Sequence, residues 1–569
     1  MKSSMRLLAL GFMATHAIGF NEGSGRRALG FHSSSKWEAS QKPSVLPRKG
    51  SPVATTLQAT ARSLCPLIMA AIAIVFCAAC NVSNRPGSAI PISPANQRIS
   101  HLSQSGVVVD PSQVGPKVST SVLGATAEVW FDVARAGLAP SFVQAGMATT
   151  RWPGGHAADR YHWRTNTFSR GICGEGRNVG KPNPNATFNH FMQDLALPAH
   201  LDVAITVNYG SNAQCDRGAN PKEAADWVKY ANDTQGYNIT WWTVGNEQYT
   251  QDSLDLHSKP HDPSQYARIE KREYYQQMKA ASRIPIKVCV DASIKYVDWD
   301  ATVFKQAKYD CVEVHFYPQT GTSVSDAFLL KNAVQGFTQS IQTVQSQLAT
   351  VGRPKTPIYV GEIGSALPPG DKQNMSITQA LYAGQIIGEM LNEGIARSTW
   401  HSGYGTCDPE SDGGDFSKSL YGWQNFGGTM IFSTGTRQHH CSHEDVPLGT
   451  LMPTAVTYEV ASQFVRNGER MLGASVVGMP DVRAYATTYK GGYALMLFNL
   501  NETSAENVPV TIDGKTSGSG GPVWTYDKAL YNKSKKNKWA GPKSSTLPSW
   551  QNSFNINLPP WSMIVVRTM

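Results

Sequence analysis

The sequence lacks internal repeats, low-complexity tracts and heptad patterns, which excludes solenoids and coiled coils. Charged residues are scarce, at 16% of the chain against 41% hydrophobic residues. No Cys and His residues stand at the spacings of a zinc site, and we predict neither a metal nor another cofactor. What is present is a chain of 569 residues, rich in Gly, Pro and Trp and long enough for two or three compact domains.

A basic surface is also missing from most of the chain. The formal net charge is +9, but residues 1–88 contain ten Lys or Arg against two Glu and so account for +8 of it. Binding to nucleic acid requires clustered positive charge. We therefore predict no nucleic-acid partner for the folded part.

An apolar run from Leu64 to Cys80 follows Arg62. The run is shorter than the about 20 residues of a membrane span, and it ends in small residues as a signal peptide does. The stretch FCAAC also resembles a bacterial lipoprotein processing site, which would attach a lipid to Cys80 and hold the protein at a membrane. We predict a leader over residues 1–83, a polar linker over 84–104, and export to a secreted, periplasmic or lipid-anchored location.

The six remaining cysteines divide by their surroundings. Four lie in loops and could form disulfides in an oxidising compartment: Cys173 and Cys215 in two Gly/Asn-rich loops, and Cys407 and Cys441 flanking one long loop. Cys289 and Cys311 lie inside apolar strand segments, KVCVDAS and DCVEVHFYP, which predicts two buried thiols.

Short apolar strands alternate with amphipathic helices over residues 105–460. The strand segments are TSVLGATAEVW, MATTRWPGG, LDVAITVNYG, NITWWTVGNE, IPIKVCVDAS, YDCVEVHFYP, TPIYVGEIG and ARSTWHSG. Between them, stretches such as NPKEAADWVKYANDT have apolar residues at intervals of three and four residues, the spacing of an amphipathic helix. Eight such units predict an α/β fold, a closed (β/α)8 TIM barrel.

Beyond residue 460 the pattern changes to strands separated by turns. Period-two alternation in RAYATTYKGGYALMLFNLNETSAENVPVTIDG and in FNINLPPWSMIVVRTM predicts a C-terminal all-β sandwich over residues 461–569. The strand-like SGVVVD precedes the barrel, and residues 105–118 could join either domain.

Two glutamates end strands of the predicted barrel. Glu247 in WWTVGNEQY follows the fourth strand, and Glu362 in YVGEIGS ends the seventh. An acidic residue at one strand end is more often a solvated loop residue, but two of them meet at the mouth where barrel enzymes hold their chemistry. Glycoside hydrolysis needs one carboxylic acid and one carboxylate in this arrangement.

The motifs around these residues are TTRWPGGHAADRYHWR, ITVNYGSN, NPKEAADWVKYAN, WWTVGNEQY, VHFYP, YVGEIGS and LPPWSMIVV. With them the chain resembles the retaining glycoside hydrolases of clan A, and looks closest to the family 51 α-L-arabinofuranosidases and their relatives, over residues 105–569. The resemblance implies that Glu247 is the general acid/base and Glu362 the nucleophile.

The resemblance also implies roles for residues of other strands. Arg151 would support the nucleophile, and Tyr317 would donate a hydrogen bond to it. Glu128 in ATAEVW matches a sugar-binding Glu on the first strand, the alternative being a surface residue. His156 takes a position that contacts sugar in the arabinofuranosidases, where Asn or Cys is commoner, so the identity of the sugar is open at this residue.

Residue type alone gives further candidates for substrate binding. The amide of Asn246 can hold the sugar 2-hydroxyl without adding charge. Alternation in CVEVHFYP places His315 on the face of Tyr317, where it can orient its neighbours or simply form a buried hydrogen bond. Asn208 at the end of the third strand could bind substrate, and Trp400 at the end of the eighth could offer a flat face to a sugar ring.

The proposed chemistry sets expectations for geometry and protonation. In a retaining enzyme the two carboxyl groups lie about 5 to 5.5 Å apart. Glu362 must be ionised to attack, so we expect positive or hydrogen-bonding neighbours. Glu247 must be protonated, so we expect burial and the other carboxylate to raise its pKa toward about 6 to 7.

The sequence thus predicts an exported retaining glycosidase that acts on polysaccharide side chains, with α-L-arabinofuranoside as the leading substrate. Alternatives in the same clan are an endo-β-glucanase, a xylanase, a galactofuranosidase and a β-glucuronidase. The alternative from another class is a non-catalytic carbohydrate-binding surface protein, against which the paired carboxylates argue. Carbohydrate is the predicted partner, and the sequence does not indicate an oligomeric state.

Overall fold

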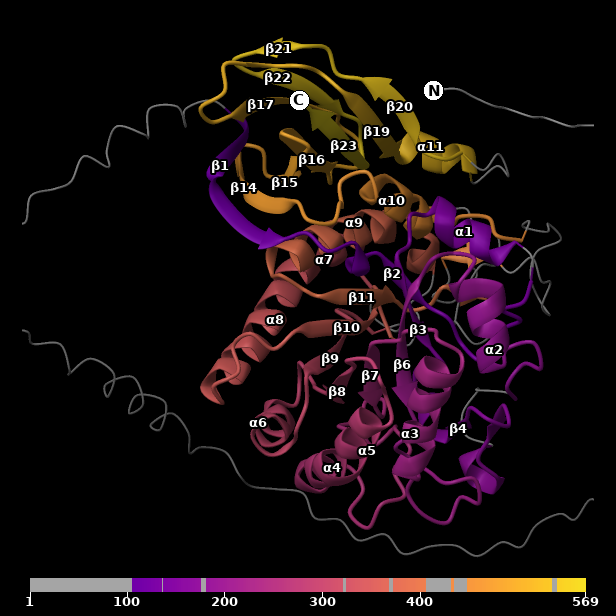
Figure 1. The fold of residues 1–569 in the computed structure, drawn as a ribbon. Coiled ribbons are helices and arrows are strands. Elements are labelled where there is room, and N and C mark those ends of the chain that lie inside the picture. Colours follow the sequence, from indigo (N-terminus) through magenta and orange to yellow (C-terminus); the bar gives the residue numbers. More distant parts are fainter. Residues whose placement is uncertain are drawn as a thin grey trace, which may run out of the picture. The chain divides into compact units, whose positions relative to one another are not determined.

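The computed structural model describes residues 105–135, 137–174, 181–320, 324–367, 372–405, 431–433, 448–534 and 540–569 (Figure 1). They belong to one compact unit, Ser93–Met569. The predicted leader, the linker and Cys80 lie outside these residues, as do Cys407 and Cys441. Among the described helices, none has the length and apolar character needed to cross a membrane.

Eight parallel strands close into a barrel, which confirms the predicted (β/α)8 fold. They follow one another around the barrel in chain order: β2 (Gly124–Thr126), β3 (Thr149–Trp152), β6 (Asp202–Val207), β7 (Trp241–Val244), β8 (Lys287–Asp291), β9 (Cys311–Phe316), β10 (Ile358–Ile363) and β11 (Arg397–Trp400). Each falls inside one of the predicted segments. Because all eight strands are parallel, their carboxyl ends open at one mouth.

Helices follow the strands and cover the outside of the barrel (Figure 1). They are α1 (Leu138–Gln144), α2 (Phe188–His190), α3 (Pro221–Lys229), α4 (Pro263–Ile269), α5 (Tyr275–Ala280), α6 (Val297–Gln306), α7 (Asp326–Lys331), α8 (Ala333–Thr350), α9 (Ile377–Asn392) and α10 (Pro453–Ala461). Asn220, Asp262 and Ser376 begin α3, α4 and α9 by accepting backbone N–H groups of the first turn.

Shorter elements fill the connections. They are the 3-10 helices η3 (Thr120–Val122), η4 (Ala158–Arg160), η5 (Gly171–Cys173) and η9 (Lys372–Met375), the π-helices η6 (Phe191–Ala196), η7 (Tyr230–Thr234) and η8 (Glu270–Tyr274), and the short strands β4 (Tyr161–His162), β5 (Thr167–Phe168), β12 (Tyr404–Gly405), β13 (Phe432–Ser433), β18 (Ser517–Gly518) and β21 (Trp550–Gln551). Of these, η4 lies in the connection from β3 to β6, next to the mouth residues described below.

The last part of the chain forms a nine-stranded sheet with the order β20-β19-β23-β16-β15-β14-β1-β17-β22. Its strands are β1 (Gly106–Lys117), β14 (Arg470–Val477), β15 (Val482–Tyr489), β16 (Gly492–Asn499), β17 (Glu506–Ile512), β19 (Pro522–Asp527), β20 (Lys543–Thr546), β22 (Phe554–Leu558) and β23 (Ser562–Thr568), with α11 (Lys528–Lys533) after β19. Val510 and Ile556 of one end share an apolar core with Leu495 and Val566 of the other, so the sheet curls into a sandwich, as predicted. β1 precedes the barrel in the chain but pairs with β14 and β17 of this sheet.

Helix α9 joins the barrel to the terminal sheet. Its buried residues point in all directions, as expected for a helix packed on every side. A Cβ at Gly384 would meet the ring of Phe498 at 2.7 Å, so the helix lies close against the sheet. The hydroxyl of Tyr485 donates to Glu389 at 2.9 Å. The terminal sheet therefore supports the barrel directly.

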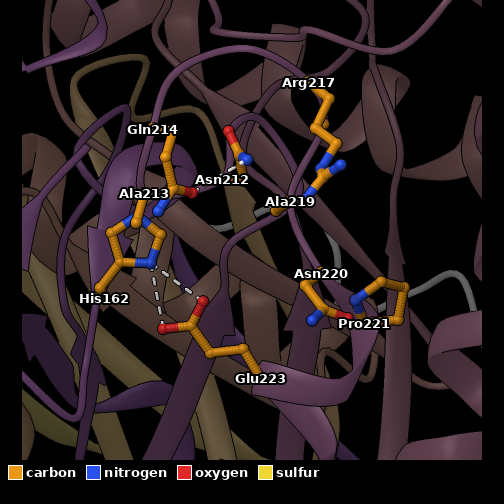
Figure 2. Close-up of a pocket in the computed structure, with 10 residues that line it drawn as sticks. His162, Asn212, Ala213, Gln214, Arg217, Ala219, Asn220, Pro221 and Glu223 are labelled. Atoms are coloured by element: carbon orange, nitrogen blue, oxygen red, sulfur yellow. Dashed lines mark hydrogen bonds and ion pairs between the residues drawn. The ribbon is translucent and has the colours of Figure 1, made fainter. Parts of the chain in front are cut away.

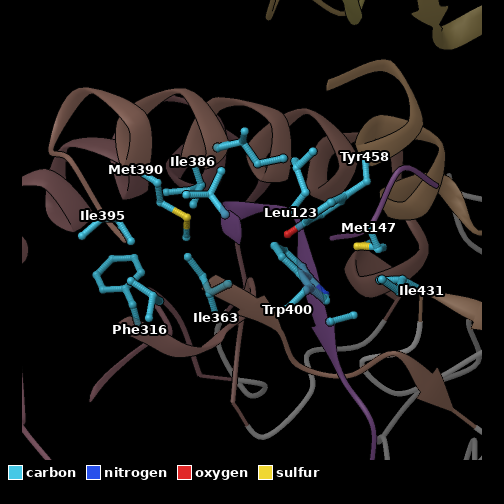
Figure 3. Close-up of a cluster of buried hydrophobic side chains, with 14 of the residues drawn as sticks. Leu123, Met147, Phe316, Ile363, Ile386, Met390, Ile395, Trp400, Ile431 and Tyr458 are labelled. Carbon is cyan, nitrogen blue, oxygen red and sulfur yellow. The ribbon is translucent and has the colours of Figure 1, made fainter. Parts of the chain in front are cut away.

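Trp400 belongs to the core between barrel and helices, which corrects its predicted role. Its side chain is 1% exposed and packs with Leu123 and Tyr458 on the outside of the barrel (Figure 3). The preceding Thr399 points inward, where its hydroxyl donates to the carbonyl of Gly361. Since side chains alternate along a strand, Trp400 points outward and offers no face to a sugar.

Two disulfides are present in the described part. Cys173–Cys215 joins two of the four cysteines whose pairing the sequence left open. Cys289–Cys311 corrects the predicted buried thiols, because the two residues are direct partners on β8 and β9 with Cα atoms 4.4 Å apart. Neighbours at one level of parallel strands project to the same side, so the two sulfurs meet.

A Cys173→Ser/Cys215→Ser double variant is expected to unfold at a lower temperature than the wild type. The bond closes a separation of 42 residues, for which loop-closure entropy predicts about 4 kcal/mol of stabilisation. Thermal unfolding followed by circular dichroism measures the difference, with the reduced wild type as the control. An unchanged midpoint would contradict a stabilising bond.

Candidate active site

Glu247 and Glu362 lie at the same mouth of the barrel. Glu247 comes just after β7, and Glu362 lies near the end of β10. Their carboxylate oxygens and a ring nitrogen of His315 lie within 4.8 Å of one another. This spacing fits the close pair of a retaining glycosidase, at about 5 to 5.5 Å, better than the about 6.5 to 9.5 Å of an inverting pair.

A β-bulge aims Glu362 into the mouth. β10 pairs with β9 at Val360–Val314 and next at Glu362–His315, so Gly361 has no partner on β9. An extra residue of this kind bends a strand and redirects the following side chain. The glutamate and His315 thus face each other across neighbouring strands.

Glu362 is held as a carboxylate. Nη1 of Arg151 donates to its Oε1 at 2.8 Å, and the hydroxyl of Tyr317 donates to its Oε2 at 2.7 Å. Burial acts to raise the pKa of Glu362, but the charges of His315, His401 and Arg151 outweigh it and lower the pKa to about 2. The expected ionised state of Glu362 is therefore confirmed.

Arg151 fixes three groups from one buried position. Its Nε forms an ion pair with Glu313 at 2.9 Å, its Nη1 bonds Glu362, and its Nη2 donates to Oδ1 of Asn246 at 2.7 Å. Burial acts to lower the pKa of Arg151, but the charges of Glu313 and Glu362 raise it overall. The amide nitrogen of Asn246 has no acceptor among the described residues, so this group can donate to a ligand.

Glu247 lies between two histidines. Nε2 of His156 is 3.0 Å from its Oε2, Nδ1 of His315 is 2.8 Å from its Oε1, and the hydroxyl of Tyr249 donates to the same Oε1 at 3.2 Å. Burial acts to raise the pKa of Glu247, but the hydrogen bonds and charges of His156 and His315 lower it well below its usual value. This corrects the expected raised pKa: His156 and His315 shift the pKa of Glu247 downward and favour its ionised form.

The backbone at Glu247 is in the left-handed region. Its φ is 52°, and that of Gly245 is 79°. A Cβ at Gly245 would meet Cγ of Gln248 at 2.9 Å, so only glycine fits there. A non-glycine residue in this conformation costs of order 1–3 kcal/mol and persists where its surroundings enforce it.

The turn after β3 brings His156 to Glu247. A Cβ at Gly155 would meet Oε1 of Glu362 at 2.8 Å, so a glycine is required where the backbone passes the carboxylate. The side chain of His156 is 37% exposed, compared with 4% for His315. His156 is therefore the histidine that an incoming ligand can reach and displace.

Glu128 is buried at the mouth, which excludes the alternative of a surface residue. The hydroxyl of Thr126 donates to its Oε1 at 2.7 Å, and Nδ1 of His401 lies 3.4 Å from that oxygen. Burial raises the pKa of Glu128 well above its usual value, and the charge of Glu362 adds to the effect. Burial and the nearby charge of Glu362 therefore favour the protonated form of Glu128.

Asn208 does not join the carboxylates. Its Nδ2 donates to the carbonyl of Ser211 at 2.9 Å, and its Oδ1 accepts the N–H of Ser211 at 3.2 Å. Both ends of the amide stabilise its own loop, which corrects the prediction that it binds substrate.

The atoms of Glu247, His315 and Glu362 have the spacing of a metal ligand set, but their protonation opposes one. Burial acts to lower the pKa of His315, but the charge of Glu362 and hydrogen bonds to Glu247 and Glu313 raise it to about 10. A protonated ring has no free lone pair for a cation. Arg151 also neutralises Glu362 already.

A cavity of about 480 Å³ lies in the connection between β6 and α3 (Figure 2). Nδ1 of His162 bonds Glu223 at 2.9 Å, and the amide of Asn212 donates to Gln214 at 3.2 Å. These polar groups satisfy one another, and the paired glutamates do not line the cavity. We assign it no part in the chemistry.

His401 and Tyr249 are among the residues of the site that were not predicted. His401 follows the outward-pointing Trp400 and therefore points to the mouth, so the alternation along the eighth strand could have identified it. Tyr249 stands two residues after Glu247 and donates to it at 3.2 Å. No sequence pattern distinguishes this tyrosine from a core aromatic residue.

The fold is shared with solved structures, although no family model and no curated protein matches the sequence. An α-L-arabinofuranosidase from Thermotoga maritima, in an arabinose complex, is 16% identical with a TM-score of 0.60, over 82% of this chain and 99% of its own. The family 51 α-L-arabinofuranosidase from Thermotoga petrophila is 15% identical with a TM-score of 0.63, over 82% and 100%. A family 44 xyloglucanase from Paenibacillus polymyxa is 11% identical with a TM-score of 0.56, over 81% and 99%. These similarities establish the shared architecture of barrel and β-domain.

Proposed function

We propose that the protein is a retaining glycoside hydrolase. The observation that carries the proposal is the close pair Glu247 and Glu362, of which Glu362 is held ionised by Arg151 and Tyr317. A binding module has no need of two carboxylates facing each other with one fixed as a nucleophile. The shared fold with known glycosidases supports the same class.

In the proposed reaction, Glu362 attacks the anomeric carbon while the bond from that carbon to the leaving oxygen breaks. Glu247 donates a proton to the leaving oxygen. In the second step Glu247 takes a proton from water, and the water oxygen displaces Glu362 from the carbon, so the configuration is retained.

The structure adds a condition on the first step. His156 and His315 lower the pKa of Glu247, so before it acts as an acid it must take up a proton, which the neighbouring imidazolium groups can give. His156 is the more exposed of the two histidines and can yield its position to the leaving group. We propose that Asn246, whose amide nitrogen has no acceptor among the described residues, holds a sugar hydroxyl.

An α-L-arabinofuranoside is the proposed substrate. Support comes from the fold shared with arabinofuranosidases and from Glu128 and Asn246 beside the nucleophile. Similarity to a xyloglucanase and to a bifunctional glucanase-xylanase keeps an endo-acting β-glycanase as the second candidate.

A substrate panel tests this proposal. Nitrophenyl furanosides and pyranosides are assayed beside arabinan, xylan and glucan, and the first-formed anomer is read by proton NMR. We expect release from the arabinofuranoside with retention. Inversion would contradict the double displacement, and glycan binding with no cleavage of any substrate would favour a binding protein.

The nucleophile is expected to stay reactive in acid. A dinitrophenyl 2-deoxy-2-fluoroglycoside needs no proton to lose its leaving group, so its labelling rate follows the ionisation of Glu362 alone. With a lowered pKa of about 2, Glu362 remains charged at pH values where an ordinary Glu protonates. Mass spectrometry should show less than about a twofold change in rate between about pH 7 and 4. A decline with a midpoint near about 4.3 would mean an unperturbed carboxyl.

We also propose export of the protein. The apolar run from Leu64 to Cys80 and the two disulfides support an oxidising compartment. Cell fractionation with mass spectrometry of the mature N-terminus tests this, and labelled fatty acid tests whether Cys80 carries a lipid. Recovery of the uncleaved chain in the cytosol would contradict export.

A further inference from the structure

We propose that Asp159 and Asp291 are positioning residues, which set the place of Glu247 by holding the backbone on both of its sides. This inference rests on the proposed function of Glu247 as the acid/base. Neither aspartate forms a hydrogen bond with the carboxylate pair, and neither was a candidate site residue, although Asp159 lies within the motif TTRWPGGHAADRYHWR.

The two contacts are symmetric about Glu247. The N–H of Asn246, the residue before it, donates to Oδ2 of Asp159 at 3.1 Å. The N–H of Gln248, the residue after it, donates to Oδ2 of Asp291 at 3.0 Å. Each acceptor comes from a different part of the barrel, since Asp159 lies in η4 beyond β3 and Asp291 ends β8.

Further hydrogen bonds tie Asp159 to the segment after β6 and Asp291 to the strand before Glu247. Oδ1 of Asp159 accepts the N–H of Tyr209 at 3.3 Å. The N–H of Asp291 donates to the hydroxyl of Tyr266 at 3.0 Å, and that hydroxyl donates to the carbonyl of Val244 at 2.7 Å. The hydroxyl of Tyr266 thus links Val244, at the end of the strand before Glu247, to Asp291, which holds the residue after Glu247.

The backbone they hold is the part of the site under conformational strain. Glu247 has a φ of 52°, which L-residues adopt only when their surroundings impose it. Two backbone N–H groups fixed from opposite sides supply such a constraint. Without them the segment can relax, and the carboxyl group of Glu247 moves with it.

Fold stability alone gives no reason for carboxylates at these positions. Asp159 is completely buried and Asp291 is 2% exposed, and neither forms an ion pair within the described part of the chain. Burial raises the pKa of both, that of Asp291 to about 7. Each aspartate bears the cost of burial while its side chain accepts a backbone N–H beside Glu247, which points to a role in fixing that segment.

Displacement of an acid/base has a kinetic signature. Proton donation matters most when the leaving group is a poor one, and little when it departs readily as an anion. A misplaced Glu247 therefore lowers cleavage of a phenyl glycoside more than that of a 2,4-dinitrophenyl glycoside. A loss of folded enzyme lowers both by the same factor.

The experiment compares these two glycosides, made with the sugar that the wild type cleaves. Asp159→Ala and Asp291→Ala are expected to lower kcat/KM for the phenyl glycoside roughly tenfold more than for the dinitrophenyl glycoside. Asp291→Asn keeps an acceptor for Gln248 and should restore most of the difference. Asp159→Asn can serve only one of its two N–H donors and should restore less.

Asp300→Ala is the matched control. Asp300 is also completely buried, but its Oδ1 accepts the N–H of Ser293 at 2.6 Å and not an N–H next to Glu247. Its replacement should lower kcat/KM for both glycosides by the same factor, and it should also lower the melting temperature. If the Ala variants do not fold, the two Asn variants carry the comparison.

Equal losses for the two leaving groups in the folded Asp159 and Asp291 variants would overturn the positioning role. That outcome differs from failure of the proposed function, in which the wild type itself cleaves neither glycoside of any sugar in the panel.

Discussion

A Glu362→Ala variant is expected to lose about 10⁴-fold or more of kcat on every substrate, whatever the leaving group. The side chain is the attacking group, and without it no covalent intermediate forms. Initial rates with a nitrophenyl glycoside measure the loss. Intact-protein mass spectrometry with the fluoroglycoside should detect no adduct in the variant and one adduct in the wild type.

Glu362→Gln separates charge from shape in the same position. The amide keeps the volume and can still accept from Tyr317, so the fold is preserved, but it cannot attack. It should be as inactive as Glu362→Ala while melting closer to the wild type. Both variants leave Arg151 with one anion fewer, but only Gln keeps the volume and an acceptor oxygen, so Glu362→Ala should be the less stable variant. Turnover within about tenfold of the wild type would refute the role of nucleophile.

In a Glu247→Ala variant, kcat/KM for a phenyl glycoside is expected to fall about 10²- to 10⁴-fold. For a dinitrophenyl glycoside it should fall far less. Its first step needs no acid with the good leaving group, so hydrolysis of the intermediate becomes limiting. Azide fits the space left by the carboxylate and needs no base. Added azide should therefore accelerate turnover and give a glycosyl azide of retained configuration.

Tyr249→Phe provides the matched control for Glu247. It removes one hydrogen bond to Oε1 and leaves His156 and His315 in place. We expect only a small loss, no effect of azide and no dependence on the leaving group beyond that of the wild type. An azide response in Tyr249→Phe, or none in Glu247→Ala, would remove the acid/base assignment.

The barrel could be predicted because its strands are short apolar runs that stop at turn residues or at polar side chains. Glu247 and Glu362 were found for the same reason, since parallel strands deliver their ends to one mouth. Arg151, Tyr317 and Glu128 follow from strand ends together with the family resemblance, and His315 follows from the alternation along its strand. These inferences depend on local pattern and on topology, which the sequence expresses directly.

The wrong predictions arise where the direction of a side chain or the identity of its hydrogen-bond partner had to be known. Trp400 and His401 are adjacent, and only the alternation set by Thr399 determines which of the two points to the mouth. Asn208 looks identical whether its amide faces a ligand or its own loop. A shift of one residue along the strand decides which of Trp400 and His401 points to the mouth, and one local hydrogen bond decides where the Asn208 amide points. Neither can be read from the residue types alone.

The protonation of Glu247 shows a second kind of limit. A raised pKa is the correct expectation for burial beside another carboxylate, but two histidines from separate parts of the chain reverse it. Cys289 and Cys311 are a similar case, because their disulfide depends on equal height in neighbouring strands. Such effects belong to pairs of residues that are far apart in sequence.

The position of β1 has a consequence for synthesis on the ribosome. Gly115 in β1 receives a hydrogen bond from Arg470 in β14, 355 residues later. At translation rates of roughly 5–20 residues per second, about 20 to 70 seconds pass between the synthesis of β1 and that of β14. During that interval its edges are open and its valines are uncovered. The nascent chain therefore carries an aggregation-prone segment that is synthesised before the whole barrel. A factor that binds and shields residues 106–117 would raise the yield of folded protein.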